Sequence, residues 1–268
     1  MVWRLRWRVT HSLWPLAYRG RFRVFVMKDG LGASLFYTGS TEPEIEEFVV
    51  RFLKPGMRFV DVGAHVGIYS LLAAAAVGPA GEVISFEPNP EARRVLELNI
   101  AENRFHNVRV RGEAVADAAG MRDFEICEES SVSSLNGGAG EFPKRRSSRL
   151  IKVESTTLDA ALGAGGESIH LIKIDAEGAE LPVLKGASSL LGSPAAVAPI
   201  LIFECEPGNY AFFGYTPQDV FGYLESRGFA VYCCQGKKRF RRVSMRDVPS
   251  DVKNLIAAKE GACFPFPV

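Results

Sequence analysis

The feature that most constrains the fold is an apolar run that ends in a glycine turn and is followed by a second apolar run with an acid at its end. The first run and its turn lie within 59–70, where Asp61 precedes a G-x-x-x-G turn from Gly63 to Gly67. The second run ends at Glu87. This order predicts a strand, a turn, a helix and a second, parallel strand. Ligands of open parallel sheets bind outside the carboxyl ends of the strands, and an acid about 20 residues past the turn can bind a ribose diol. The chain is therefore predicted to bind a nucleoside-containing cofactor.

The chemistry of the turn narrows the choice of cofactor. The dinucleotide fingerprint G-x-G-x-x-G lets backbone amides approach a pyrophosphate, whereas this turn carries His65 and Val66 between its glycines. S-adenosylmethionine has no phosphate; its ammonium suits an acid such as Asp61, and its carboxylate suits amides at a helix start. Alternatively, the glycines serve only close packing. The acid at Glu87 disfavours that alternative, because turn and acid have the spacing that the fold requires.

Composition favours one α/β domain with additions. A chain of 268 residues that is 47% hydrophobic can bury one large core or two small ones. The net charge of +1 gives no reason to expect a nucleic-acid partner. Apolar segments fall short of the roughly 20 residues that span a bilayer, and arginines stand where a secretory signal would have its apolar core, so we predict a cytoplasmic protein. The cysteines are odd in number and form no C-x-x-C pair, which predicts buried thiols rather than disulfides or a zinc site: Cys127, Cys205, Cys233, Cys234 and Cys263.

The N-terminal segment forms a basic arm. Seven basic residues precede the first acid, Asp29, and are interleaved with Trp3, Trp7 and Trp14: Arg4, Arg6, Arg8, Arg19, Arg21, Arg23 and Lys28. Such an arm could touch an anionic membrane surface or an acidic glycolipid. We favour an arm that folds back on the domain, because its amphipathic pattern is poor and Pro15 interrupts it.

Strands and helices alternate along most of the chain, which predicts a doubly wound, mostly parallel sheet. The predicted strands span 57–62, 82–87, 107–111, 168–175, 199–206 and 229–234. The predicted helices span 67–77, 90–103, 178–191 and 216–227. Upstream, 22–38 predicts a β-hairpin and 44–53 a short helix. We therefore divide the chain into an extension, 1–54, that packs its arm, hairpin and helix on the core, and a main domain, 55–268. The segment 117–152 has a looser pattern, and 130–149 within it is irregular and basic, as in functional or disordered loops.

A second group of acids follows the apolar run 169–174. Asp175 is expected at the carboxyl end of a strand, on the same rim of the sheet as Asp61 and Glu87. Lys173 lies two residues earlier, so it should point to the same face and pair with Asp175. Acids at a helix start cap amides and suit the helix dipole, and we interpret Glu180 in this structural way.

Together these motifs resemble the FkbM-type S-adenosylmethionine-dependent methyltransferases. The glycine motif is similar to 60–70, the second motif to 86–90, and the late motif to 156–159 followed by 172–180 and 183–187. The similarity extends from about Glu42 to a last predicted strand at 254–258. Two positions depart from the family pattern. His65 stands where the family usually has asparagine, which would alter a contact to the methionine end of the cofactor, and Ala176 stands where it usually has valine.

The resemblance implies a class I methyltransferase fold with a seven-stranded sheet over 55–268, and S-adenosylmethionine as cofactor. It implies a small hydroxylated acceptor such as a sugar, glycolipid or natural product, and O-methylation as the reaction. Glu87 would bind the ribose hydroxyls, 113–115 would border adenine, and Asp175 and Glu177 match the characteristic acids of the family. The residues that it places around the cofactor are Asp61, Gly63, Ala64, His65, Gly67, Glu87, Pro88, Glu113 and Ala114.

Methyl transfer to a hydroxyl requires alignment of the two reactants and removal of the hydroxyl proton. We predict Asp175 as the base or the acceptor-orienting group, with Glu177 assisting, and no metal. A metal-assisted variant is the alternative, in which hard oxygen ligands bind magnesium or calcium. The carboxylates available for it are Asp175, Glu177, Glu204 and Glu206.

Two other functions remain open at this stage. A nicotinamide-dependent dehydrogenase would use the same turn and ribose acid, but predicts a third glycine where Ser70 or Leu71 stands. A non-enzymatic module could hold an acidic glycan or lipid through the basic arm and the loop 130–149. The acceptor pocket could include an aromatic wall, although ordinary packing explains the same residues better: Tyr210, Phe212, Phe213 and Tyr215.

Overall fold

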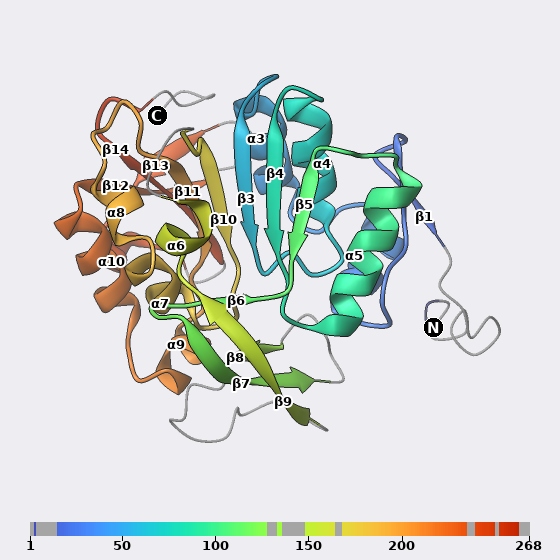
Figure 1. The fold of residues 1–268 in the computed structure, drawn as a ribbon. Helices are drawn as coiled ribbons and strands as arrows, with labels where there is room; N and C mark the ends of the chain where they lie inside the picture. Colours follow the sequence, from blue (N-terminus) through green and yellow to red (C-terminus); the bar gives the residue numbers. More distant parts are fainter. Residues whose placement is uncertain are drawn as a thin grey trace.

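A large mixed sheet lies at the centre of the molecule (Figure 1). The computed structural model describes residues 3, 15–127, 133–135, 148–163, 168–234, 239–249 and 252–262. The sheet has eight strands in the order β13-β12-β14-β11-β10-β3-β4-β5. The strands are β3 (Arg58–Val62), β4 (Glu82–Phe86), β5 (Val108–Arg111), β10 (Leu171–Ile174), β11 (Ile200–Glu204), β12 (Phe229–Cys234), β13 (Phe240–Arg242) and β14 (Asn254–Lys259).

This sheet confirms the predicted doubly wound, mostly parallel α/β fold. Strands β5, β4, β3, β10 and β11 are parallel, β14 runs against both β11 and β12, and β13 runs against β12. The sheet has eight strands rather than the seven expected, because β13 adds an edge strand. Phe240 fixes this strand: it is buried and meets the ring of Phe48 edge-on, with 5.4 Å between ring centroids.

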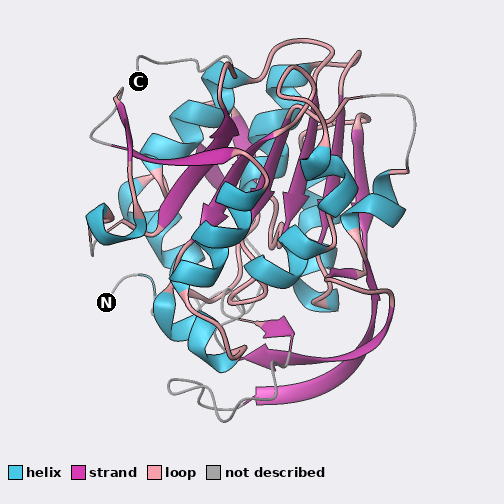
Figure 2. Ribbon diagram, turned by 90° about the vertical axis from the view of Figure 1, so that its left-hand side faces the viewer, coloured by secondary structure: helices cyan, strands magenta, loops and turns pink. Residues whose placement is uncertain are grey.

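Helices cover both faces of the sheet (Figure 2). Strand residues alternate between the two cores, so Phe59 and Leu171 join one, whereas Val60 and Ile172 join the other; apolar side chains on both faces are typical of parallel strands. The first face carries α2 (Gly30–Thr38), α3 (Pro43–Phe52), α4 (Ile68–Val77) and α5 (Pro90–Glu102). The second carries α6 (Leu158–Leu162), α7 (Glu180–Lys185), α8 (Ser188–Gly192), α9 (Pro207–Phe212) and α10 (Pro217–Ser226).

One long helix predicted at 178–191 is instead two short ones, α7 and α8. The chain turns at Gly186, where a Cβ atom would lie 2.0 Å from the carbonyl oxygen of Ala116. This close approach requires glycine, and glycine favours helix interruption. The predicted starts and ends of the other main-domain helices agree with the structure to within a few residues.

A second, smaller sheet lies below the carboxyl ends of the parallel strands in Figure 1. Its order is β6-β9-β7-β8, and its strands are β6 (Ala114–Val115), β7 (Gly120–Cys127), β8 (Ser134–Leu135) and β9 (Ser148–Thr156). The prediction of a looser region over 117–152 was therefore wrong: β7 and β9 pair antiparallel from Gly120 with Ser155 to Cys127 with Ser148. Buried Phe124, Ile126 and Val153 hold this pair together. Most of the predicted loop 130–149 lies outside the described residues.

The extension has the predicted hairpin and helix, but the hairpin lies earlier than 22–38. It is formed by β1 (Leu16–Tyr18) and β2 (Phe22–Val24). The second half of the predicted hairpin is the helix α2, because Asp29 Oδ1 accepts from Gly32 N at 2.8 Å and Gly39 ends the helix with φ +73°. Trp3 is buried and packs on Phe36 at 5.4 Å between ring centroids, so the arm folds back at this residue. Trp7 and Trp14 lie outside the described residues.

Two sequence expectations concern thiols and membranes. Cys127, Cys205 and Cys233 are buried free thiols and Cys234 is half-buried, whereas Cys263 lies outside the described residues. Within the described part of the chain, no helix has both the length and the apolar character needed to cross a bilayer.

Candidate active site

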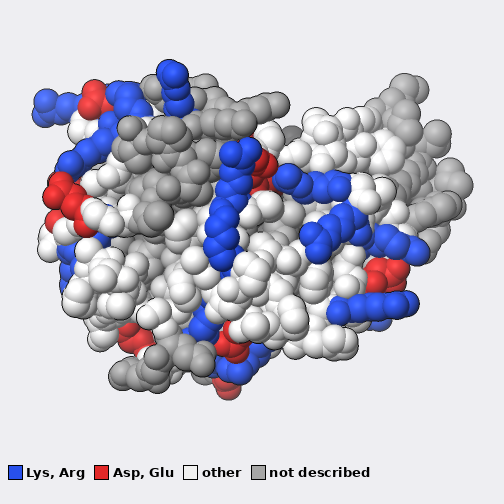
Figure 3. All heavy atoms as spheres, turned by 90° about the horizontal axis from the view of Figure 1, so that it is seen from above, with Lys and Arg blue, Asp and Glu red and all other residues white. Residues whose placement is uncertain are grey.

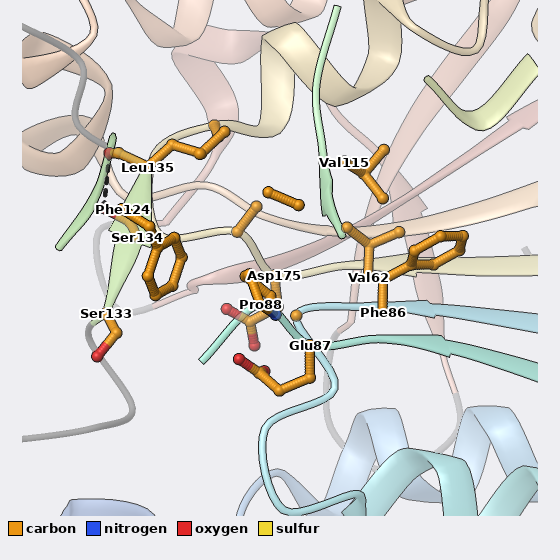
Figure 4. Close-up of a pocket in the computed structure, with 14 residues that line it drawn as sticks. Val62, Phe86, Glu87, Pro88, Val115, Phe124, Ser133, Ser134, Leu135 and Asp175 are labelled. Atoms are coloured by element: carbon orange, nitrogen blue, oxygen red, sulfur yellow. Dashed lines mark hydrogen bonds between the residues drawn. The ribbon is translucent and has the colours of Figure 1, made fainter. Parts of the chain in front are cut away.

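Two adjacent cavities open at the carboxyl ends of β3, β4 and β10, and they share Gly63, Glu87, Ser133 and Asp175. The smaller cavity is mainly apolar. Figure 4 shows Phe124 and Leu135 of the second sheet across this cavity from Val62 and Phe86 of the main sheet. The larger cavity, of about 370 Å³, is lined mainly by polar and charged residues and falls within the usual range for small-molecule sites. Besides the shared residues, it includes four of the predicted site residues: Asp61, Ala64, His65 and Glu177. Lys173, which was predicted to pair with Asp175, also lines it.

The glycine turn packs directly on the loop after β10. Gly63 has φ +77°, and a Cβ atom there would lie 1.8 Å from the carbonyl oxygen of Asp175. Gly67 has φ +89°, and its Cβ would lie 2.3 Å from Leu96 Cδ1. The amides of Gly63 and Ala64 both donate to Phe86 O at 3.0 Å. Both glycines are thus required by packing. Gly63 lines both cavities, whereas Gly67, which was also predicted to bind the cofactor, lines neither.

Substituting Gly63 with alanine should therefore lower the free energy of unfolding by at least about 1–2 kcal/mol, the ordinary cost of a left-handed backbone for a residue with a Cβ, and weaken cofactor binding. Denaturant unfolding and calorimetry measure the two effects. Gly222→Ala is the control, since its Cβ would meet nothing within 4 Å and it lies inside α10. Equal stability of the two variants would contradict the packing argument.

Glu87 connects two turns at the mouth of the smaller cavity. It is 5% exposed; Oε2 accepts from His65 N at 2.7 Å and Oε1 accepts from Asn89 N at 2.8 Å. Burial raises the pKa of Glu87, while the charge of His65 and these amides act in the opposite direction. Pro88 and Ala114, which were predicted to bind the cofactor, line the smaller cavity beside it.

His65, one of the two departures from the family pattern, contacts the extension. Its Nε2 lies 3.2 Å from Asp29 Oδ2, at the start of α2, and its φ is +50°. Burial lowers the pKa of His65, but the hydrogen bond and charge of Asp29 outweigh burial and raise the pKa above its usual value. His65 therefore ties the glycine turn to α2.

Lys173 lies at the centre of the acids on the sheet rim. It is 2% exposed, pairs in register with Asp61 of β3, and its Nζ lies 2.7 Å from Asp175 Oδ2, which confirms the predicted pair. Its Nζ also lies 4.6 Å from the centroid of the Tyr69 ring. Burial lowers the pKa of Lys173, yet Asp175, Glu42 and Asp61 together raise it. This lysine therefore keeps its charge.

Asp61 is itself buried, and its environment is polar. Its Oδ2 accepts from Ser70 Oγ at 2.6 Å, and Ser70 in turn lies 2.8 Å from Ser85 Oγ. Burial raises the pKa of Asp61, whereas Lys173 and Ser70 act to lower it. Ser70, which stands where a dehydrogenase fingerprint would have glycine, thus holds the carboxylate of Asp61.

Three carboxylates, two from the loop after β10 and one from the end of β11, meet in the larger cavity: oxygens of Asp175, Glu177 and Glu204 all lie within 4.8 Å of one another. Glu177 has φ +51° and its Oε2 accepts from Asn209 Nδ2 at 2.8 Å. Glu204 Oε2 is buried and has no hydrogen-bond partner among the described residues. Burial, with the charges of Asp175 and Glu177, raises the pKa of Glu204 to about 9.

Such a group can receive a hard cation, but the ammonium of Lys173 already bonds to Asp175, and we assign no metal ligand here. Glu206, the fourth carboxylate of the metal alternative, pairs with Lys253 at 3.1 Å. Sequence reasoning weighed Glu204 as a metal ligand or as a residue that only marks the rim of the sheet, and gave it no role in the reaction. The signal for a larger role was its position at the end of an apolar run beside the strand that carries Asp175.

Glu180 has the structural role that was predicted. It is fully buried, and its two oxygens accept from Ala176 N at 2.8 Å and Gly178 N at 3.0 Å. Burial, followed by the charge of Glu204, raises the pKa of Glu180 to about 8. This carboxyl group holds the loop that presents Asp175 and Glu177.

Some predicted residues lie away from the cavities. Glu113 bonds to the guanidinium of Arg111 and lines neither cavity, and the hydrogen bond to Arg111 lowers its pKa. The four aromatic residues considered as an acceptor wall also line neither cavity; Tyr210 and Phe212 are buried, and Tyr215 donates to Gly178 O at 2.5 Å. The packing interpretation of this segment is the one that the structure supports.

The extension supplies a wall that sequence reasoning did not assign to particular residues. Its members in the larger cavity are Gly30, Leu31, Ser34, Thr41 and Glu42. Glu42 connects this wall to the sheet, since its carboxylate accepts from Tyr69 Oη at 2.5 Å and from Asn254 Nδ2. The cavity is thus closed by residues that precede β3.

A family model and two known proteins match this chain in sequence. The family model described as the methyltransferase FkbM domain matches residues 61–231. The methyltransferase sdnD of Sordaria araneosa is 27% identical over 198 residues, which are 64% of this chain and 73% of that protein. The AMB antimetabolite synthetase AmbE of Pseudomonas aeruginosa is 30% identical over 166 residues, which are 50% of this chain and 8% of the synthetase.

Solved structures give more distant similarities. A SAM-dependent O-methyltransferase from Thermotoga maritima is 15% identical with a TM-score of 0.45, covering 89% of this chain and 74% of its own. The methyltransferase FkbM from Methylobacillus flagellatus is 14% identical with a TM-score of 0.46, covering 80% of this chain and 50% of its own.

Proposed function

Because the chain belongs to the FkbM methyltransferase family, with S-adenosylmethionine as its methyl donor, we propose that it methylates a hydroxyl group of an uncharged, polyhydroxylated sugar or natural product. The observation that carries this proposal is the charge of the larger cavity, where six carboxylates face two lysines. The carboxylates are those of Glu42, Asp61, Glu87, Asp175, Glu177 and Glu204, and the lysines are Lys173 and Lys253.

This surplus of acids is particular to the cavity. The whole chain has a net charge of +1, and the face above the amino ends of β3 and β4 shows more Lys and Arg than Asp and Glu (Figure 3). Carboxylates accept hydrogen bonds from hydroxyls, and like charges repel phosphate or carboxylate groups on a ligand. An acceptor rich in hydroxyls and without negative charge is the one that this lining suits.

The cofactor fits the remaining part of the crevice. The apolar lining of the smaller cavity, with Phe86, Pro88 and Ala114, suits adenine, and Glu87 at its mouth suits the ribose hydroxyls. When bound, the cofactor supplies an electrophilic methyl group on a positively charged sulfur. The carboxylate of Asp61 lines the larger cavity that adjoins this position and favours that charge.

Asp175 and Glu177 are the groups that we assign to the acceptor. Asp175 is held by Lys173 at 2.7 Å, and Glu177 is held by Asn209 at 2.8 Å. Carboxylates fixed in this way can accept a hydrogen bond from the acceptor hydroxyl in one orientation, and alignment is the main requirement of an in-line displacement.

Glu87→Gln should weaken S-adenosylmethionine binding roughly 10- to 150-fold, the equivalent of about 1.5–3 kcal/mol for a hydrogen bond to a charged group. The amide of glutamine would also place an NH₂ group against the backbone N–H of His65 or Asn89, where two donors cannot form a hydrogen bond. Isothermal titration calorimetry measures the change. Glu91→Gln, on the exposed first turn of α5, is the matched control; equal affinity of both variants would remove Glu87 from the ribose site.

The proposed function is tested in two steps. Calorimetric titration with S-adenosylmethionine and with NAD should give binding of the first alone. Methyl transfer from labelled cofactor is then measured on a panel of neutral sugars, sugar phosphates, uronic acids and amino sugars, with label expected in the neutral sugars and absent from the phosphates. Binding of NAD alone would favour the dehydrogenase, and transfer only to amines would replace oxygen by nitrogen as the acceptor atom.

A further inference from the structure

Glu204 differs from the other two carboxylates of its group in how its charge is balanced. Asp175 bonds to the ammonium of Lys173, and Glu177 accepts from Asn209. Glu204 Oε2 is buried, with no hydrogen-bond partner among the described residues, although Glu204 lines the larger cavity. Because Glu204 lines this cavity, an acceptor hydroxyl can approach its carboxyl group, one oxygen of which bonds to no described group.

The surroundings of Glu204 are mostly acidic. The charged and titratable groups around it come from β10, the loop after β10, α7, the end of β11, α9 and the residue before β14: Lys173, Asp175, Glu177, Glu180, Cys205, Glu206, Tyr210 and Lys253. Of the two lysines, Lys173 is bonded to Asp175 and Lys253 to Glu206. A negative charge on Glu204 is thus left without a close counter-ion of its own.

We propose that Glu204 accepts the hydroxyl proton of the methyl acceptor, and that the positive charge of bound S-adenosylmethionine keeps its carboxyl group ionised for this role. The inference rests on the proposed function and adds the identity of the base and the event that activates it. In the methyl-transfer step, the acceptor oxygen bonds to the methyl carbon and the hydroxyl proton passes to Glu204. The electron pair of the broken C–S bond stays on sulfur, which becomes a neutral thioether.

The titration of Glu204 agrees with this order of events. Its pKa is raised to about 9 by burial and by Asp175 and Glu177, so the carboxyl group is protonated near neutral pH. A positive charge a few ångströms away favours the ionised form and lowers a carboxyl pKa by about 1–3 units. Binding of the cation should therefore release a proton, and its affinity should rise with pH until the pKa of the free protein is reached. S-adenosylhomocysteine, the product, has a neutral sulfur and should not lower the pKa of Glu204 in this way.

The test compares proton release on binding of S-adenosylmethionine and of S-adenosylhomocysteine. Wild-type protein and Glu204→Gln are titrated calorimetrically near neutral pH, in phosphate and in Tris, with EDTA present. The difference in heat between the buffers gives the number of protons exchanged. When S-adenosylmethionine binds, wild type should release up to one proton more than E204Q. When S-adenosylhomocysteine binds, the two proteins should not differ. If wild type and E204Q release the same number of protons with each ligand, the inference is wrong.

A control variant and the behaviour of the wild-type protein separate the possible failures. Glu206→Gln removes an acid two residues away that pairs with Lys253, and it should release protons as wild type does. If wild type binds no S-adenosylmethionine, the proposed function itself is wrong; if it binds without the extra proton, only the role of Glu204 is wrong. Extra proton release that requires added Mg²⁺ would assign the three carboxylates to a metal and also overturn the inference.

Activity gives an independent readout once the acceptor panel has identified a substrate. Turnover of E204Q should fall by about 10²–10⁴-fold, the usual contribution of a general base, whereas E206Q should stay close to wild type. A more acidic hydroxyl in the same acceptor should restore part of the lost rate in E204Q, because it needs less help to lose its proton. Wild-type turnover in E204Q would remove Glu204 from the reaction.

Discussion

Asp175→Asn should lower turnover by at least about 100-fold, the loss that a misaligned reactant can cause, and should change the affinity for S-adenosylmethionine far less. The substitution removes the negative charge that faces the acceptor and weakens the bond to Lys173, so the hydroxyl is no longer held in one orientation. Methyl-transfer kinetics and calorimetry measure the two quantities.

The matched control for this prediction is Asp123→Asn. Asp123 lies on β7 and pairs with Lys152 at the surface, so the same change of acid to amide should leave kinetics unaltered. If Asp175→Asn retains full turnover, Asp175 has no part in the reaction. If it loses cofactor binding in proportion to turnover, Asp175 belongs to the cofactor site rather than to the acceptor side.

Lys173→Met should lower the free energy of unfolding by about 3–5 kcal/mol, as expected when one partner of a buried ion pair is removed. Asp61 is 1% exposed, and with Lys173 gone both Asp61 and Asp175 would lack their common counter-ion. Denaturant unfolding of both proteins gives the difference.

The control is Lys152→Met, which breaks an exposed pair with Asp123 and should cost at most about 1 kcal/mol. The double variant Lys173→Met with Asp175→Asn should recover part of the loss, because one uncompensated charge is removed as well. A loss below about 1 kcal/mol in the single variant would show that Lys173 does not balance these acids.

Sequence alone predicted the part of the site that depends on strand ends. Asp61, Glu87 and Asp175 each follow an apolar run, and parallel strands bring their carboxyl ends to one edge; these three side chains line the larger cavity. The Lys173–Asp175 pair followed from the two-residue period of a strand. Local patterns were sufficient here because each residue is placed by its own strand.

Features that depend on distant pairing were not predicted. The pairing of β7 with β9 joins Gly120 to Ser155 across a long stretch of intervening chain, and no local pattern gives that register. The helix α2 was read as a strand, because its alternating apolar residues outweighed the capping aspartate at Asp29. Glu204 was undervalued because its partners come from a different strand and its burial follows from packing.

The wall formed by α2 and the residues before α3 has a consequence for how acceptors are chosen. Leu31, Ser34 and Thr41 precede the matched segment 61–231, whereas the smaller cavity, which we assign to adenosine, is built within it. Part of the acceptor wall is thereby encoded in a stretch of the gene that precedes the segment carrying the reactive carboxylates. Exchanging 30–42 between relatives should redirect the enzyme to new substrates while the methyl donor stays the same.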